Sequence, residues 1–479
     1  MTLAYSRRGL LGLLGLALLP RLALALIFLR YPIGLDDMFQ YDMLARSLAS
    51  GKGFRWYSRE DVERMRPHLE TVFGIELPVE QVPVEGYLTV HRAPGYPVLL
   101  SALYVLVGFE NRIAAARLFQ VFLGASLAPL TALLACELGL AAPAARRAGV
   151  IVAVYPILWM YPLGLASENL FIPLVLAGVI VSLRAIDGRR LGIAVAAGFL
   201  LGAATLTRGV LAAFLPLAGL LFLRRTGLRN ALGMLLPAAL VVLPWIVRNS
   251  LILGRPAFVE NSLGYNLFIG YHPEGDGGFF SEAAVIPLHI LDDGERERWS
   301  MGQALGFIRD DPAGAAARVV RRLGFLWGLE DRELLYFYSN DFFGRIPQPW
   351  LLMAYLVLVS PLILIGSSAP FGMALTPRGR DLILGLFVAS HLAYLSILAE
   401  PRFHLPLVPY LAVYAAAAWS RRRSATFLWQ GLRRLDPRWV LAAGAALVLL
   451  VLWTWDLWRE WPALISIMGP EGNALRLAY

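Results

Sequence analysis

The sequence predicts an all-α polytopic membrane protein with about eleven membrane-spanning helices. Hydrophobic residues make up 58% of the 479-residue chain and charged residues only 16%, a balance that a soluble domain of this length could not bury. Eleven apolar runs reach about 20 residues, the length at which a helix crosses a bilayer. These runs begin near Leu10, Ala114, Ala148, Leu170, Leu191, Val210, Ala231, Trp350, Leu382, Leu405 and Val440.

The formal net charge of the chain is +9, which in a soluble protein would suggest nucleic-acid binding. Here the arginines fall mostly in loops between apolar runs, as the positive-inside rule predicts, so no nucleic-acid partner is expected. We place Arg7 and Arg8 in the cytoplasm and interpret Pro94–Gly108 as a re-entrant or interfacial segment. Nearly all the arginine clusters of short loops then share the cytoplasmic side: Arg146–Arg147, Asp187–Arg190, Arg224–Arg229, Thr376–Asp381 and Arg421–Arg438.

The same topology brings the unusual polar residues to the external face. Any one of them could be an end-cap that snorkels to the interface, but ionisable groups at this depth are costly unless they are paired or face a polar cavity. As a set they predict an external polar site that comprises Asp36, Asp37, His91, Arg92, Glu168, Arg208, Arg248, Asn249, Glu400, Arg402 and His404.

These residue types suit the transfer of a group from a phosphate-linked lipid to a hydroxyl or amine. One carboxylate of Asp36-Asp37 can take the proton of the acceptor. Fixed cations at Arg92, Arg248 or Arg402 can hold the phosphate as it leaves. The amphipathic segment Met38–Ser50 predicts a helix in the headgroup layer, beside the lipid. Its apolar face carries Met38, Tyr41, Leu44, Ala45 and Leu48.

Motifs in a fixed order carry a resemblance to a known family. They are Asp37 with Tyr41, Ala45-Arg46, Leu48 and "GKGF" at Gly51–Phe54, then "HRAPGYP" at His91–Pro97, "SENL" at Ser167–Leu170, "LTRG" at Leu206–Gly209, "PWIVRN" at Pro244–Asn249, "GYNLFIGYHPEGDGGF" at Gly264–Phe279 and "EPRFHLPLVPYL" at Glu400–Leu411. In these motifs the chain resembles the GT-C superfamily of polyprenyl-phosphate-sugar-dependent glycosyltransferases. Its bacterial members related to protein O-mannosyltransferases and to the lipid A aminoarabinose transferase are the most similar. The resemblance implies a GT-C type bundle of about eleven transmembrane helices with external juxtamembrane helices.

The resemblance also implies roles for individual residues. Counting back from Gly51–Phe54 makes Asp37 the catalytic base and Asp36 an extra acid, whereas a register shift of one residue would exchange them. Arg92 matches a basic residue near the donor phosphate, and Glu168 matches a second external carboxylate. Arg402, with His404 nearby, matches polar residues that face the donor.

The implied reaction is a single inverting displacement. A hexosyl or pentosyl group moves from a polyprenyl (undecaprenyl-type) phosphate to an acceptor protein, lipid or glycan. The resemblance places this on the external, periplasmic face of a bacterial inner membrane. Part of the superfamily has been associated with a divalent metal, but His91 and His404 alone do not establish one, so no cofactor is assigned and a metal stays an open alternative.

Two other functions use similar residues. A transporter or flippase for lipid-linked sugars would also need arginines for phosphate, but it would not need an acidic pair, and inverted repeats and midplane charges are not found. A polysaccharide polymerase or ligase would tend to carry Arg-rich external loops without the early acidic pair.

The predicted topology divides the chain into three parts. Residues 1–247 form an N-terminal transmembrane catalytic module that contains the first external loop, 31–93. Residues 248–349 form a long external loop, in which Asp292–Pro312 predicts an amphipathic helix ended by the proline and Ala313–Leu326 predicts a second helix. Residues 350–479 contain the C-terminal transmembrane helices and an external tail.

Overall fold

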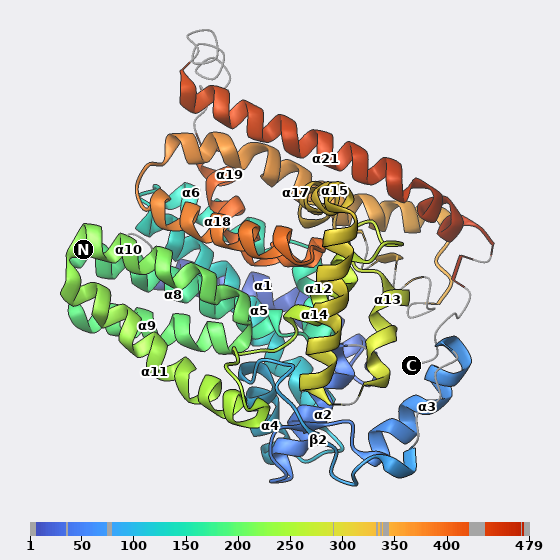
Figure 1. Cartoon of the computed structure of the whole chain (residues 1–479). Helices are drawn as coiled ribbons and strands as arrows, with labels where there is room; N and C mark the ends of the chain where they lie inside the picture. The colour runs from blue at the N-terminus through green and yellow to red at the C-terminus, as the bar shows by residue number, and fades with distance from the viewer. Residues whose placement is uncertain are drawn as a thin grey trace.

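A computed structural model describes residues 6–34, 37–73, 79–290, 292–331, 334–335, 338, 344–420, 436–470 and 472–473. Within these ranges the chain is almost entirely helical (Figure 1). The only strands described are β1 (Arg55–Trp56) and β2 (Tyr87–Leu88), which form a two-stranded antiparallel ladder with Arg55 opposite Leu88.

Each of the eleven predicted apolar runs forms a helix. Seven are long and apolar enough to cross a membrane: α1 (Arg7–Ile27), α5 (Arg112–Glu137), α8 (Glu168–Gly188), η3–α10 (Gly209–Thr226), α11 (Leu228–Leu253), α17 (Gln348–Leu375) and α21 (Pro437–Met468). The other four have 12 to 17 residues: α6 (Ala142–Ala153), α9 (Leu191–Thr207), α18 (Arg380–Ser396) and α19 (Val408–Trp419). The chain is therefore a multi-pass membrane protein.

The long helices pack in two neighbouring groups. Helices α8, α9, α10 and α11 lie against one another, and α17 lies between α19 and α21, the red helix along the top of Figure 1. Helix α5 joins the groups because it contacts α1, α6, α8 and α19. Small residues such as Ala125, Ala128 and Ala132 are fully buried on α5, which lets neighbouring backbones approach closely where lipid supplies no hydrophobic drive.

The segment between α1 and α5 folds into short helices beside the bundle. They are α2 (Asp37–Ala49), α3 (Arg59–Phe73), the 3₁₀ turn η1 (Val79–Gln81) and α4 (Gly95–Val107). The helix predicted at Met38–Ser50 is therefore confirmed as α2. The "GKGF" motif reverses the chain after α2, and Gly51 and Gly53 have φ of 73° and 84°, which an L side chain rarely adopts.

Both faces of α2 are covered by protein. Phe39, Met43 and Leu44 pack in a cluster with Phe54 and Trp56. Tyr41 and Ala45 pack in a second cluster with Tyr96, Leu100 and Tyr104, all three from α4. Helix α4 spans only 13 residues, about 20 Å at 1.5 Å per residue, which is short of a ~30 Å hydrocarbon core.

The segment between α11 and α17 carries a further set of helices. They are α12 (Leu263–Tyr271), α13 (Ser281–Val285), η4 (Ile286–His289), α14 (Asp293–Asp310) and α15 (Pro312–Leu326). Two short helical turns, α7 (Ile157–Met160) and η2 (Tyr161–Leu163), lie earlier in the chain, between α6 and α8. The two helices predicted around Pro312 are confirmed as α14 and α15, which form the yellow column in Figure 1. A 3₁₀ segment, η5 (Pro401–Leu407), precedes α19.

Candidate active site

The carboxylate of Asp37 is shared by two arginines from distant parts of the chain. Asp37 opens the first turn of α2 and its side chain is 30% exposed. Its Oδ1 pairs with Arg92, and its Oδ2 lies 3.1 Å from Nη1 of Arg402. Burial raises the pKa of this carboxyl, but the Arg92 and Arg402 guanidiniums outweigh it and hold the pKa of Asp37 well below its usual range. Asp37 is therefore an ionised carboxylate that can accept a proton.

Arg92 is oriented by a second contact on α2. Its Nε and Nη2 donate to the side-chain oxygen of Gln40 at 2.8 and 2.6 Å. Gln40 lies one turn beyond Asp37, so one guanidinium spans both side chains. The Gln40 amide in turn donates to the Tyr57 hydroxyl at 3.4 Å. This chain of hydrogen bonds fixes where Arg92 meets Asp37.

A second acid–arginine pair also interacts with Tyr41. Glu168, in the first turn of α8, pairs with Arg208, which also donates to Ser167 at 3.3 Å. The Arg208 guanidinium lies 5.4 Å from the ring centre of Phe403. Tyr41 interacts electrostatically with both pairs, so α2 joins them into one site.

The third arginine links two carboxylates. Arg402 lies on η5, and its Nε donates to Glu400 at 2.5 Å while its Nη1 reaches Asp37. Glu400 is buried, and the Arg402 side chain is 35% exposed. The site therefore combines Asp37, Arg92, Glu168, Arg208, Glu400 and Arg402, six of the residues predicted from the sequence.

Packing around two motifs brings these segments together. Gly95 starts α4 so close to α9 that a Cβ atom there would lie 2.7 Å from Oγ1 of Thr207. The absence of a side chain at Gly95 thus lets the segment with Arg92 approach the segment with Arg208. Arg248 supports the same segment, since its Nη1 donates to the Thr89 carbonyl at 2.6 Å and its guanidinium stacks 4.5 Å from the Trp245 ring centre. Arg248 is not bonded to Asp37.

Asn249 is a buried anchor for the loop that follows α11. Its side-chain amide donates to the carbonyls of Phe258 and Val259 at 2.8 and 3.1 Å, and Trp245 donates to Val259 at 3.1 Å. The "PWIVRN" motif therefore fixes the loop over 258–261. This fixed loop carries Glu260, a site residue that the sequence analysis did not single out.

Glu260 enters the site between Arg92 and Arg208. Its Oε1 accepts the Gly209 N–H at 3.1 Å, and its carboxylate accepts the Ala93 N–H. Burial raises the pKa of Glu260, against the opposing effect of Arg208 and Arg92. No sequence motif marks Glu260, because its position depends on hydrogen bonds from α11 rather than on its own neighbours.

The two predicted histidines lie outside the acid–arginine cluster. His91 is buried, with ring centres of Trp56 and Tyr265 at 5.0 and 5.4 Å. Burial, followed by the charges of Arg296 and Arg92, keeps the pKa of His91 well below its usual value, so this ring is neutral. His404 is fully buried and points to Glu330, whose Oε1 lies 3.0 Å from its Nε2. Asp36 lies outside the described residues, as does 421–435 of the predicted Arg421–Arg438 cluster.

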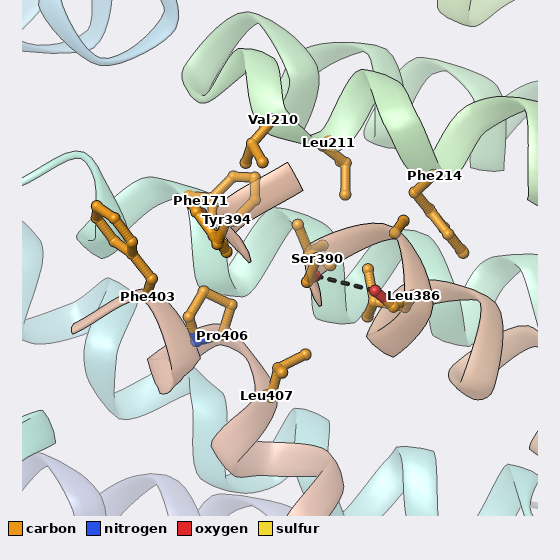
Figure 2. Close-up of a pocket in the computed structure, with 12 residues that line it drawn as sticks. Phe171, Val210, Leu211, Phe214, Leu386, Ser390, Tyr394, Phe403, Pro406 and Leu407 are labelled. Carbon is orange, nitrogen blue, oxygen red and sulfur yellow. Dashed lines mark hydrogen bonds between the residues drawn. The ribbon is translucent and has the colours of Figure 1, made fainter. Parts of the chain in front are cut away.

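An apolar pocket adjoins the arginines (Figure 2). Phe403 and Phe171 line it and also contact Arg208. Its other lining side chains come from α8, η3, α10, α18 and η5, and the Ser390 hydroxyl is turned back to the Leu386 carbonyl at 2.9 Å. The rings of Phe171 and Phe403 thus separate the charged Arg208 from the apolar interior of the pocket.

The described residues around Asp37 can be compared with the ligand sets that hold divalent metals. In the part of the chain that the structure describes, no three His, Cys, Asp or Glu side chains are grouped to hold a metal ion. The carboxylates of the site are instead bonded to arginines and to backbone N–H groups.

Comparison with solved structures identifies the architecture. The oligosaccharyltransferase of Archaeoglobus fulgidus, with an acceptor peptide containing the NVT sequon tethered by a disulfide bond, matches with a TM-score of 0.51 and 14% identity over 99% of this chain and 56% of that one. The chain has the GT-C fold. The apo form of the same archaeal enzyme matches the GT-C bundle with a TM-score of 0.50 and 15% identity over 98% of this chain and 60% of that one. This chain thus spans less than two thirds of the length of these enzymes. No family model and no curated protein matches the sequence.

Proposed function

We propose that this GT-C protein is an inverting glycosyltransferase that moves a sugar from a polyprenyl-phosphate donor to an acceptor hydroxyl or amine. The observation that carries the proposal is the sharing of Asp37 by Arg92 and Arg402. A base and two phosphate-binding cations then lie within one hydrogen-bonded unit. General-base catalysis and stabilisation of the leaving anion are the two demands of this reaction.

In the proposed step, the acceptor oxygen or nitrogen attacks the anomeric carbon of the donor sugar. Its proton passes to Asp37, and the bond between the anomeric carbon and the phosphate oxygen breaks. The released polyprenyl phosphate gains negative charge, which Arg92, Arg402 and Arg208 balance. Asp36 is kept as the alternative base, and Arg248 has a supporting role through Thr89.

The apolar walls of the pocket beside Arg208 match the chemistry of the first isoprenyl units of the donor. Phe171, Phe403 and Leu211 are apolar lining groups next to the arginines, so a phosphate on Arg208 would direct its lipid tail between α8 and α18. Burial of apolar surface contributes about 25 cal/mol per Å² to such binding. The shared fold with an oligosaccharyltransferase supports glycosyl transfer over lipid transport.

We place the reaction on the external face of a bacterial cytoplasmic membrane. The support for this orientation is the arginine-rich character of the short loops on the opposite side, at Asp187–Arg190 and Arg224–Arg229. The acceptor, whether protein, lipid or glycan, would approach from the side of residues 248–349. No step in this mechanism requires a metal.

Product formation in proteoliposomes tests the proposal. Purified protein with a polyprenyl-phosphate sugar and cell-envelope acceptors should form glycosylated product, and Asp37→Asn should lower kcat by about 10²- to 10⁴-fold, the usual contribution of a general base. The variant should still bind the donor. Glu282→Gln, at an exposed position on α13, is the matched control. Full activity of Asp37→Asn would refute Asp37 as the base, and lipid translocation without product would favour a transporter.

A further inference from the structure

Among the described residues, Glu260 gives the acid–arginine cluster one more carboxylate than it has arginines. Three described guanidiniums, Arg92, Arg208 and Arg402, meet four described carboxylates, which belong to Asp37, Glu168, Glu260 and Glu400. With all of them ionised, the cluster is net negative. An incoming phosphodiester is itself an anion, and like charges repel most strongly where water is excluded. The cluster must therefore lose one negative charge to bind such a donor well.

The contacts single out which carboxylate can lose its charge. Asp37, Glu168 and Glu400 each have a guanidinium within ion-pair distance. Among the described residues, Glu260 has none within 4 Å, and it is held by the N–H groups of Gly209 and Ala93. A protonated carboxyl keeps a carbonyl oxygen that can accept such bonds, so Glu260 can become neutral without losing them.

The groups that face Glu260 come from three segments. Arg92 precedes α4, Arg208 follows α9, and Tyr394 lies on α18. Two of these are positive and stabilise the ionised form while no ligand is bound. A phosphodiester anion that engages Arg92 and Arg208 would offset part of their positive charge and leave the burial of Glu260 less compensated.

We propose that Glu260 takes up one proton from solvent when a lipid phosphodiester binds between Arg92 and Arg208. The inference rests on the proposed function, because it assigns the donor phosphate to these arginines. Donor binding is then coupled to proton uptake, and the loop fixed by Asn249 serves to hold the carboxylate that takes up the proton. This coupling also accounts for a carboxylate that feels the charge of two arginines yet is hydrogen-bonded to backbone N–H groups.

The experiment measures proton uptake on binding of a short prenyl phosphodiester, farnesyl methyl phosphate, to the full-length protein in detergent. A diester has no second ionisation near neutral pH, so any linked proton belongs to the protein. Calorimetry in buffers of different ionisation enthalpy should show uptake of close to one proton per ligand. Between the pKa of unliganded Glu260 and its higher pKa in the complex, the Kd should rise by up to about tenfold per pH unit, as linkage requires.

Glu260→Gln should bind without proton uptake and with a Kd that is flat with pH, and Glu282→Gln should behave like the wild type. Binding without proton uptake by the wild type, or unchanged uptake in Glu260→Gln, would overturn the assignment to Glu260. Failure of the wild type to bind the diester at any pH would instead count against the proposed lipid-phosphate donor. Because proton uptake is read on the wild type, a poorly folded variant does not remove the test.

Discussion

The carboxylate of Asp37 lies 3.1 Å from the guanidinium of Arg402, although 365 positions separate the two residues in the chain. Arg402 also holds Glu400 at 2.5 Å, so a single side chain bridges the start of α2 and the start of η5. This bridge joins the segment between α1 and α5 to the segment that precedes α19. It also means that Asp37 and the arginines bonded to it cannot be perturbed independently.

Two substitutions of Arg402 should distinguish the contribution of its charge to activity from the contribution of its guanidinium geometry. Arg402→Gln removes the bridge and should lower kcat/KM by about 10²- to 10³-fold, the usual cost of losing one charge-stabilising donor. Arg402→Lys keeps the charge, but a compact ammonium cannot pair with Asp37 and Glu400 in the forked manner of a guanidinium. An intermediate loss is therefore expected, measured as initial rates against donor concentration.

The matched control is Arg64→Gln, since Arg64 lies on α3 with its side chain 54% exposed and pairs only with the exposed Glu60. That variant should keep the wild-type rate. Equal losses for Arg402→Gln and Arg402→Lys would show that geometry, not charge, is what the bridge contributes.

A larger side chain in the pocket should raise the KM for donors with a long lipid chain more than the KM for donors with a short one. Ala389 is buried on α18 and lines the pocket, so Ala389→Leu adds a larger side chain where the first isoprenyl units are proposed to lie. The KM for a long-chain polyprenyl-phosphate sugar should rise about tenfold, equivalent to ~1.4 kcal/mol of lost binding. A donor with a short, water-soluble chain should be affected much less.

The neighbouring Val388 is exposed and lies outside the pocket lining, which makes Val388→Leu the control for a change of size on the same helix. Equal effects of Ala389→Leu on short-chain and long-chain donors would argue that the pocket does not hold the lipid.

Most residues of the site could be predicted from the sequence, but the contacts between them could not. Local pattern was sufficient for α2, α14 and α15, because caps, prolines and apolar periodicity act within a few residues. The motif containing Arg402 could be recognised, yet its pairing with Asp37 depends on how η5 packs against α2. Glu260 had no local signal at all, since hydrogen bonds from Trp245 and Asn249 decide where its loop lies. Phosphate binding by Arg248 stays a prediction, and its hydrogen bond to the Thr89 carbonyl could not be read from the sequence.

The ion pairs of Asp37 should stabilise the fold only above acidic pH. The pKa of Asp37 is lowered in the folded protein, so its contribution is fully present above the unfolded value of about 3.9 and is lost as pH falls toward the folded value. Between pH 5 and pH 8, Asp37→Asn should therefore lower the unfolding midpoint by a constant amount. The loss in free energy should be on the order of 1 kcal/mol, because the side chains are partly exposed and solvent screens them.

Thermal unfolding in detergent, followed at several pH values, measures this difference. The gap between wild type and Asp37→Asn should narrow below about pH 4. A gap that instead widens on acidification would contradict a lowered pKa in the folded protein.

The pair formed by His404 and Glu330 should behave as one buried unit. Nδ1 of His404 lies 2.8 Å from the Leu326 carbonyl and Nε2 lies 3.0 Å from Glu330, which also accepts the Tyr155 hydroxyl at 2.9 Å. A carbonyl can only accept, so Nδ1 carries a hydrogen and one further proton lies between Nε2 and the carboxylate. Replacing His404 alone by Leu leaves Glu330 buried without that partner and should cost about 3–5 kcal/mol, whereas His404→Leu combined with Glu330→Leu should cost much less than the sum of the single changes. A double-mutant cycle of unfolding free energies measures the coupling, with Leu392→Ala at an exposed site on α18 as the control.

Additive losses of unfolding free energy would show that His404 and Glu330 contribute separately. Strong coupling would mean that the pair anchors η5, and with it Arg402, at the position from which Asp37 is reached.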